Sequence, residues 1–162
     1  MSWFKRRSST PSTSMRDKIF LMTGEGLGIY PTEKLQHVWG VVMDATEPKA
    51  HYSLIVLADG TTSLYFSSGG GIIGAGAHPT IVAANHELME LAESLNVYFA
   101  VAGNTDLPPA GYVRFWVLTY GGVKGLEAAE KALLDGGHPL SGLFEKAQAV
   151  ITEIRHQSEN RR

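Results

Sequence analysis

The stretch YSLIVLADGTTSLYFSS (residues 52–68) holds two apolar runs on either side of Asp59-Gly60. An Asp-Gly pair between two such runs is a strong hairpin signal, because glycine readily adopts the positive φ that a tight turn requires. The preceding run HVWGVVMDAT (residues 37–46) is rich in β-branched and aromatic residues, and it is interrupted at Pro48. The sequence therefore predicts a three-stranded antiparallel meander that begins near Val38.

A helix and two more strands are expected after the meander. Residues 78–96 have apolar residues at helical spacing, and Pro79 suits the first helical position because its missing N–H has no partner there. The runs VYFAVAG (residues 97–103) and YVRFWVLTYGG (residues 112–122) are typical of strands. Phe115 and Trp116 are adjacent and so point to opposite faces, which indicates that at least one face beyond the core is covered.

Two helices are expected to close the chain. Residues 126–134 are rich in Ala, Leu, Glu and Lys, and the stretch from about Pro139 carries an apolar stripe at helical spacing. The predicted fold class is therefore α+β, with a five-stranded, mostly antiparallel sheet built as a three-stranded meander, a helix, two strands and two helices. This element order loosely resembles that of the profilin-like and roadblock-like modules, in which helices flank an antiparallel sheet.

The length of 162 residues fits a single folded domain. Residues 1–18 are predicted to be a flexible basic leader, because SSTPSTS (residues 8–14) is polar and low in complexity. Residues 19–156 are predicted to form the α+β domain, and residues 157–162 a flexible tail. The chain contains no cysteine, which fits a reducing compartment and favours a cytoplasmic location.

The charge distribution argues against nucleic-acid binding. Residues 19–154 contain six basic and fourteen acidic residues, whereas a duplex-binding face needs clustered Lys and Arg. No stretch is long and apolar enough to be a signal peptide or a membrane span. A basic and aromatic segment near the start, residues 3–7, is an alternative contact with a membrane surface, although a leader without a specific target is favoured. The segment consists of Trp3, Phe4, Lys5, Arg6 and Arg7.

The glycine-rich stretch SSGGGIIGAGAHPT (residues 67–80) matches the pattern G-x-G-x-x-G. Its context argues against a dinucleotide site, because the preceding strand is polar and belongs to an antiparallel hairpin, and Pro79 starts the next helix several residues too late. One alternative is a strand-to-helix crossing that needs glycine, with Ile72 and Ile73 as a buried plug. Another is an anion site formed by backbone N–H groups at the helix N-terminus.

Two His-Pro pairs each precede a predicted helix, at His78-Pro79 and at His138-Pro139. If the helices packed on one sheet face, the two imidazoles would meet as ligands or as acid–base groups. The simpler interpretation is that each proline fixes the entry into its helix. If the glycine-rich loop and the two histidines form one ligand-binding site, its candidate residues are Gly69, Gly70, Gly71, Gly74, Gly76, His78 and His138.

Motifs for metal binding and catalysis give little support to an enzyme. The stretch HELME (residues 86–90) has Glu90 where a zinc-protease helix needs its second histidine, and His86, Glu90 and Glu93 are expected on a solvated helix face. The sequence has no G-x-S-x-G motif and no cysteine nucleophile. No catalytic residue, metal site or cofactor is therefore predicted.

The sequence favours a non-enzymatic protein-interaction or regulatory module that binds a protein partner or forms a homodimer. This hypothesis depends on the low charged content of 19%, on the open edges of an antiparallel sheet, and on the aromatic residues of the strand that contains Trp116. The alternative is a small-ligand or anion-binding protein, or a hydrolase, that uses the loop from Gly69 to His78 together with His138.

Overall fold

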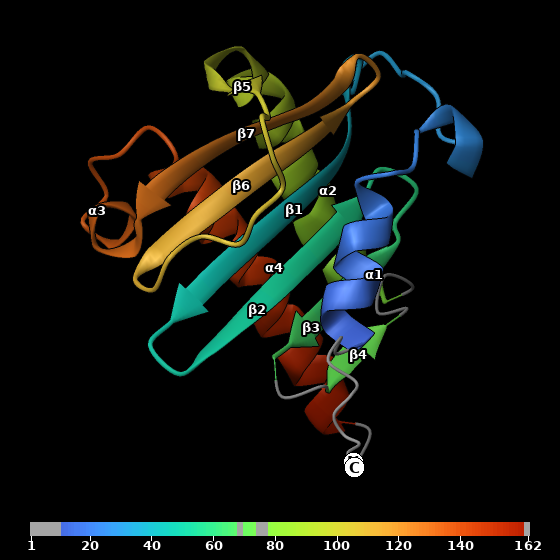
Figure 1. Cartoon of the computed structure of the whole chain (residues 1–162). Helices are drawn as coiled ribbons and strands as arrows, with labels where there is room; N and C mark the ends of the chain where they lie inside the picture. The colour runs from blue at the N-terminus through green and yellow to red at the C-terminus, as the bar shows by residue number, and fades with distance from the viewer. Residues whose placement is uncertain (1–10, 68–69, 74–77, 161–162) are drawn as a thin grey trace, which may run out of the picture.

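The computed structural model describes residues 11–67, 70–73 and 78–160. Four α-helices, seven strands and two short 3-10 turns follow one another in these residues (Figure 1). In chain order they are α1 (Pro11–Ile19), η1 (Glu25–Leu27), β1 (Val38–Glu47), β2 (Ala50–Leu57), β3 (Thr62–Phe66), β4 (Gly71–Ile73), α2 (Pro79–Leu95), η3 (Asn96–Tyr98), β5 (Ala100–Val101), β6 (Tyr112–Thr119), β7 (Gly122–Ala129), α3 (Glu130–Leu134) and α4 (Ser141–Asn160).

All strands belong to one antiparallel sheet with the order β4-β3-β2-β1-β6-β7-β5. The predicted α+β class and the meander β1-β2-β3 are confirmed, and the sheet has seven strands where five were expected. The turn after β2 forms as the Asp-Gly pair predicts: Gly60 has φ +97°, and the Thr61 N–H donates to the Asp59 carboxylate at 2.9 Å. The local sequence therefore sets the register of this hairpin.

The prediction of a helix over residues 126–134 is wrong for its first part. Residues 126–129 continue β7, which pairs with β6 from Gly122 to Ala129, and only Glu130–Leu134 is helical. Helix propensity is a weak preference, and here the ladder of hydrogen bonds to the buried strand β6 outweighs it. The run at 97–103 is likewise shorter than expected, because only Ala100–Val101 pairs with β7.

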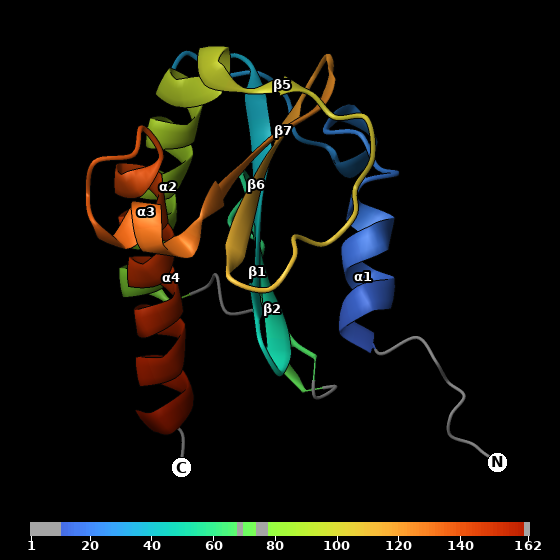
Figure 2. The same ribbon diagram turned by 60° about the vertical axis from the view of Figure 1, so that its left-hand side comes forward.

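Helices cover the two faces of the sheet unequally (Figure 2). Helices α2, α3 and α4 lie on one face, and α1 lies on the other. Phe115 is fully buried on the face of α2 and α4, and its neighbour Trp116 is fully buried in the second apolar cluster, which contains Ile19 of α1. Both faces of the sheet are therefore covered at this strand by helices of the chain itself.

The start of the folded chain differs from the expectation of a flexible leader up to residue 18. Residues 11–19 form α1, and the Arg16 side chain is only 3% exposed. At the other end, α4 continues to Asn160, beyond the predicted domain end at 156. The basic and aromatic residues from Trp3 to Arg7 lie outside the described residues. No described helix has the length and apolar character needed to cross a membrane.

Candidate functional sites

The described part of the glycine-rich stretch is the end of a hairpin. Gly71, Ile72 and Ile73 form β4 and pair with Tyr65, Leu64 and Ser63 of β3, and the Phe66 N–H donates to the Gly70 carbonyl at 2.9 Å. A Cβ on Gly71 would lie 2.9 Å from the Leu64 carbonyl oxygen, so close approach of two backbones explains this glycine. Gly69, Gly74 and Gly76 lie outside the described residues.

The two His-Pro pairs lie at opposite ends of a helix pair. Helices α2 and α4 are antiparallel, since Gly142 lies against Leu91 and Lys146 Nζ lies 2.6 Å from Glu87 Oε1. His78 precedes the start of α2, about 20 Å along its axis from Leu91 at 1.5 Å per residue. His138 precedes the start of α4 beside the other end of α2, so the two imidazoles do not share a site.

The first histidine caps α2, and the second stabilises the turn that precedes α4. The His78 Nδ1 accepts from the Thr80 N–H at 3.3 Å, and the His138 Nδ1 accepts from the Leu140 N–H at 3.0 Å. Pro79 occupies the first turn of α2, as expected. The contact at His78 satisfies a backbone donor that has no partner within the helix, which supports the structural interpretation of the first pair. Pro139 lies two residues before the start of α4, so the second pair belongs to the preceding turn.

The predicted solvated face of α2 is only partly exposed. His86 and Glu90 are exposed, but the Glu93 side chain is 16% exposed and accepts from the backbone N–H groups of His37 and Val38, each at 2.9 Å. Its second oxygen lies 2.7 Å from His37 Nδ1. Burial alone would raise the pKa of Glu93, but these hydrogen bonds outweigh it and hold the pKa below its usual value. Glu93 thus fastens α2 to the start of β1.

Replacing Glu93 with glutamine is expected to reduce stability more at neutral pH than in acid. A carboxylate with a depressed folded-state pKa contributes stability above its unfolded pKa of about 4.3, and loses it as the pH falls through the folded value. Urea unfolding of wild type and Glu93→Gln at about pH 7 and about pH 3 measures the difference, which should shrink in acid. A difference that is equal at both pH values would contradict this assignment.

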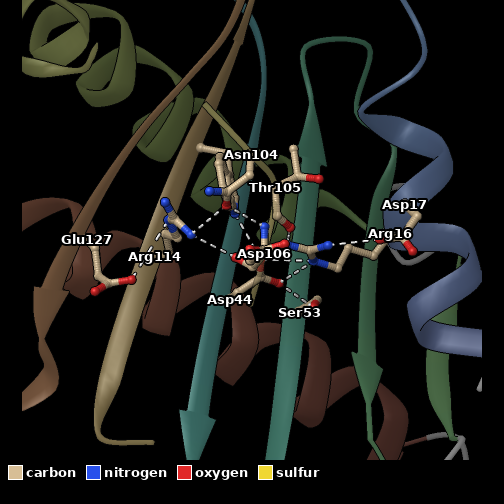
Figure 3. Close-up of polar contacts among 10 residues, drawn as sticks. Arg16, Asp17, Asp44, Ser53, Asn104, Thr105, Asp106, Arg114 and Glu127 are labelled. Carbon is tan, nitrogen blue, oxygen red and sulfur yellow. Dashed lines mark hydrogen bonds and ion pairs between the residues drawn. The ribbon is translucent and has the colours of Figure 1, made fainter. Parts of the chain in front are cut away.

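The densest polar cluster lies on the α1 face of the sheet, around Asp44 (Figure 3). Asp44 is fully buried in β1 and accepts from Arg16 of α1, with Nε at 3.1 and 3.0 Å and Nη2 at 2.8 Å. Ser53 Oγ donates to the same carboxylate at 2.5 Å, and Trp116 Nε1 donates at 2.9 Å. Both Asp44 oxygens are therefore engaged by internal donors.

The same cluster holds the loop between β5 and β6. Arg16 Nη2 donates to the Thr105 carbonyl at 2.5 Å, and Arg114 Nη1 donates to the Asp106 carbonyl at 3.0 Å (Figure 3). The Arg114 guanidinium also stacks on the Trp116 ring at 4.6 Å from its centre, and its Nε lies 3.8 Å from Glu127. The cluster therefore anchors α1 and this loop to the sheet, and it is a structural element.

Sequence reasoning missed this cluster because it assigned Arg16 to the leader. One signal was present: Asp44 interrupts an otherwise apolar strand, VWGVVMDAT, and an acid in a buried strand requires a charged or donor partner. Which cation pairs with it is decided by a helix 28 positions earlier in the chain. That pairing is a property of the tertiary structure.

A patch of exposed apolar residues lies at the β5 edge of the sheet. Val97 is 80% exposed, Tyr98 61% and Val101 84%, and Val101 belongs to the edge strand itself. Beside this patch a hollow of about 410 Å³ is lined by Val101, Val123 and the turn at Gly121-Gly122. We call Val97, Tyr98 and Val101 the β5-edge patch.

A separate cavity of about 280 Å³ lies between α2, the turn after β2 and residues 32–35. Asn85, which is 2% exposed, is one of its lining residues, and its Nδ2 donates to Thr62 Oγ1 at 2.6 Å. Thr62 in turn donates to the Gly60 carbonyl at 2.9 Å. This chain of hydrogen bonds joins α2 to the hairpin turn and explains a polar residue on the buried side of the helix.

Comparison with known proteins adds no functional information. The chain matches no protein-family model, no curated protein and no solved structure. The assignment of a function therefore depends on the geometry of the chain itself.

Proposed function

We propose that this chain is a non-enzymatic protein-interaction module that associates with a second copy of itself through the β5-edge patch. The observation that carries the proposal is the exposure of Val97, Tyr98 and Val101 beside an edge strand. Edge strands of monomers are normally protected by charges, by proline or by a covering element, and apolar residues there favour pairing with another chain.

The backbone of the edge supports pairing by strand addition. Strand β5 pairs with β7 only at Lys124 and Gly125. Among the described residues, no strand therefore covers the outer edge of β7, opposite β6, from Leu126 to Ala129. The Ala102 N–H donates to the Val123 carbonyl at 3.0 Å. Because successive residues of a strand alternate in direction, the N–H and C=O of Val101 point away from β7, toward an added strand.

The composition of the patch favours a second copy as the partner. In a two-fold symmetric contact the same surface meets itself, so a charged patch would face a like charge. The three residues of the β5-edge patch carry no charge, and the nearby Lys124 Nζ donates to the carbonyl and the side chain of Asn96, both at 3.1 Å. Contact between two copies of Val97, Tyr98 and Val101 therefore brings no charge repulsion.

Two further features support this proposal over an enzyme. Arg16 and Asp44, which have the burial typical of functional charges, are engaged by each other and by structural neighbours. His78 and His138 lie at opposite ends of the α2–α4 pair, so the hydrolase hypothesis that joins them has no shared site. We also propose a cytoplasmic location, which the absence of cysteine supports.

Replacing Val101 with lysine is expected to weaken self-association by about 30-fold or more, because it places two like charges in the contact and removes an apolar anchor. The measurement is the weight-average mass by light scattering over a dilution series. The matched control is Leu134→Lys, a charge introduced at another exposed apolar residue, which is 69% exposed on α3. The control should keep the wild-type dissociation constant within about twofold.

Two results would overturn the proposal. One is a wild-type chain that stays monomeric at the highest concentration reached. The other is a dimer whose dissociation constant is the same for Val101→Lys as for Leu134→Lys. Thermal unfolding of the variants at low concentration distinguishes weaker association from a destabilised monomer. Because both residues are exposed, each substitution should lower the stability of the folded monomer by no more than about 0.5 kcal/mol.

A further inference from the structure

A cavity of about 400 Å³ lies where the β1–β2 hairpin and the end of β3 meet the last turns of α4. It is at the end of the molecule away from β5, where α4 ends (Figure 1). The residues that matter for its chemistry are Glu47, His51, Tyr52, Phe66, Ser67 and Arg155. The cavity borders the first residue of the glycine-rich stretch, Ser67.

Two rings form one wall of this cavity. Tyr52 of β2 and Phe66 of β3 are directly opposite each other in the strand register, so their side chains lie on the same face of the sheet. Both are half-buried and pack against the edge of the core beneath α4. This wall offers an aromatic surface to a flat apolar group.

Two hydroxyl groups lining the cavity have protons to donate. Tyr52 Oη accepts from Gln148 Nε2 at 3.0 Å, and Ser67 Oγ accepts from the His51 N–H at 3.1 Å. Among the described residues neither hydroxyl proton has an acceptor. Burial is the main reason that the pKa of Tyr52 is raised above its ordinary value, so its phenol keeps this proton at neutral pH.

The charges at the rim select the charge of a ligand. Arg155 lies at the rim, is exposed, and forms no ion pair with any described residue. Glu47 lies on the same rim and is also exposed. Glu130 also acts on Tyr52, because in addition to burial its charge and that of Glu47 both raise the pKa of the phenol. The single cation favours one negative charge on a ligand, whereas Glu47 and Glu130 disfavour a second.

We propose that this cavity binds a small monocarboxylic acid with an apolar or aromatic group. The apolar group lies on Phe66 and Tyr52, and the carboxylate accepts from the Tyr52 hydroxyl and from the Arg155 guanidinium, a planar donor suited to carboxylates. This inference is independent of the proposed self-association, because no residue of the β5-edge patch lines the cavity. A negative result for one proposal therefore does not contradict the other.

The test is a titration of the full chain followed by two-dimensional amide NMR, with benzoate and phenyl phosphate as the probes. Benzoate is expected to shift the amide signals of Tyr52, Phe66 and Ser67 saturably at up to about 10 mM, the range for a ligand of this size. Phenyl phosphate carries close to two negative charges at neutral pH and is expected to bind several-fold more weakly. The two probes thus distinguish a carboxylate site from a phosphate site.

Variants assign the binding to the named groups. Arg155→Gln is expected to weaken benzoate binding about tenfold, and Tyr52→Phe about threefold to fivefold. Glu47→Gln is expected to improve the binding of phenyl phosphate more than that of benzoate. The matched controls are Lys131→Gln and Tyr30→Phe, which alter an exposed cation and an exposed tyrosine elsewhere and should leave both affinities unchanged.

Three results would overturn the inference. The first is the absence of saturable shifts at Tyr52, Phe66 and Ser67. The second is benzoate binding that is unchanged in Arg155→Gln and Tyr52→Phe. The third is tighter binding of phenyl phosphate than of benzoate, which would assign the cavity to phosphate esters. Signals of the last residues of β6, which pair with the start of β1 at the end away from the cavity, show in every titration whether the variant is folded.

Discussion

Replacing Arg16 with alanine is expected to lower the free energy of unfolding by about 3–5 kcal/mol. The substitution leaves the Asp44 carboxylate fully buried in β1 without its cation, while Ser53 and Trp116 still point at it. It also removes the donor to the Thr105 carbonyl, which holds the loop before β6. An uncompensated buried charge is far more costly than a lost surface ion pair, which is worth about 0–1 kcal/mol.

Urea unfolding followed by tryptophan fluorescence measures this effect, since Trp116 contacts the same carboxylate. The matched control is Lys18→Ala, which removes an exposed cation from the same helix and should cost no more than about 0.5 kcal/mol. Arg16→Lys keeps the charge but loses the forked geometry, so an intermediate loss is expected. Equal stability of Arg16→Ala and Lys18→Ala would show that α1 is not anchored through Arg16.

Replacing Phe115 with alanine is expected to lower the free energy of unfolding by about 3–5 kcal/mol as well. Phe115 is 0% exposed on the interior strand β6, and it lies in the core between the sheet and helices α2 and α4. The apolar side chains between the sheet and helices α2 and α4, with Phe115 among them, pack the helices against the sheet. The loss combines the apolar surface that is no longer buried with the cavity left between sheet and helices.

The measurement is the same urea titration, with Phe115→Leu as the matched control. Leucine keeps most of the apolar volume, so it should cost clearly less than alanine, by roughly half or more. A loss below about 1 kcal/mol for Phe115→Ala would mean that the core under α2 and α4 collapses around the substitution, or that this face contributes little to stability.

Local sequence signals predicted the elements whose ends are marked by turn or cap residues. Asp59-Gly60 predicted the β2–β3 hairpin, since glycine takes the positive φ that the turn needs. Pro79 and the apolar spacing of residues 81–95 predicted α2, because proline at the first turn and one apolar face are both local properties. These signals depend only on residues that are a few positions apart in the chain, so they can be recognised in a single sequence.

The errors came from contacts between distant segments. Residues 126–129 have the composition of a helix but pair with β6, and Arg16 lies in a polar segment but pairs with Asp44. The nucleotide motif in the glycine-rich stretch was correctly set aside on its context: Gly71–Ile73 pair with β3, and Gly71 allows the two strands to approach closely. Of the predicted ligand set, His78 caps α2, and His138 stabilises the turn before α4.

The direct test of self-association at the β5 edge is the exchange rate of the Val101 amide proton as a function of protein concentration. This N–H points away from β7, so it exchanges freely in a monomer and becomes hydrogen-bonded when a second copy adds a strand. We predict that its protection rises with concentration in wild type, that it does not rise in Val101→Lys, and that Ala102, already bonded to Val123, changes less. A protection of Val101 that stays constant over a concentration range spanning monomer and dimer would contradict the proposal.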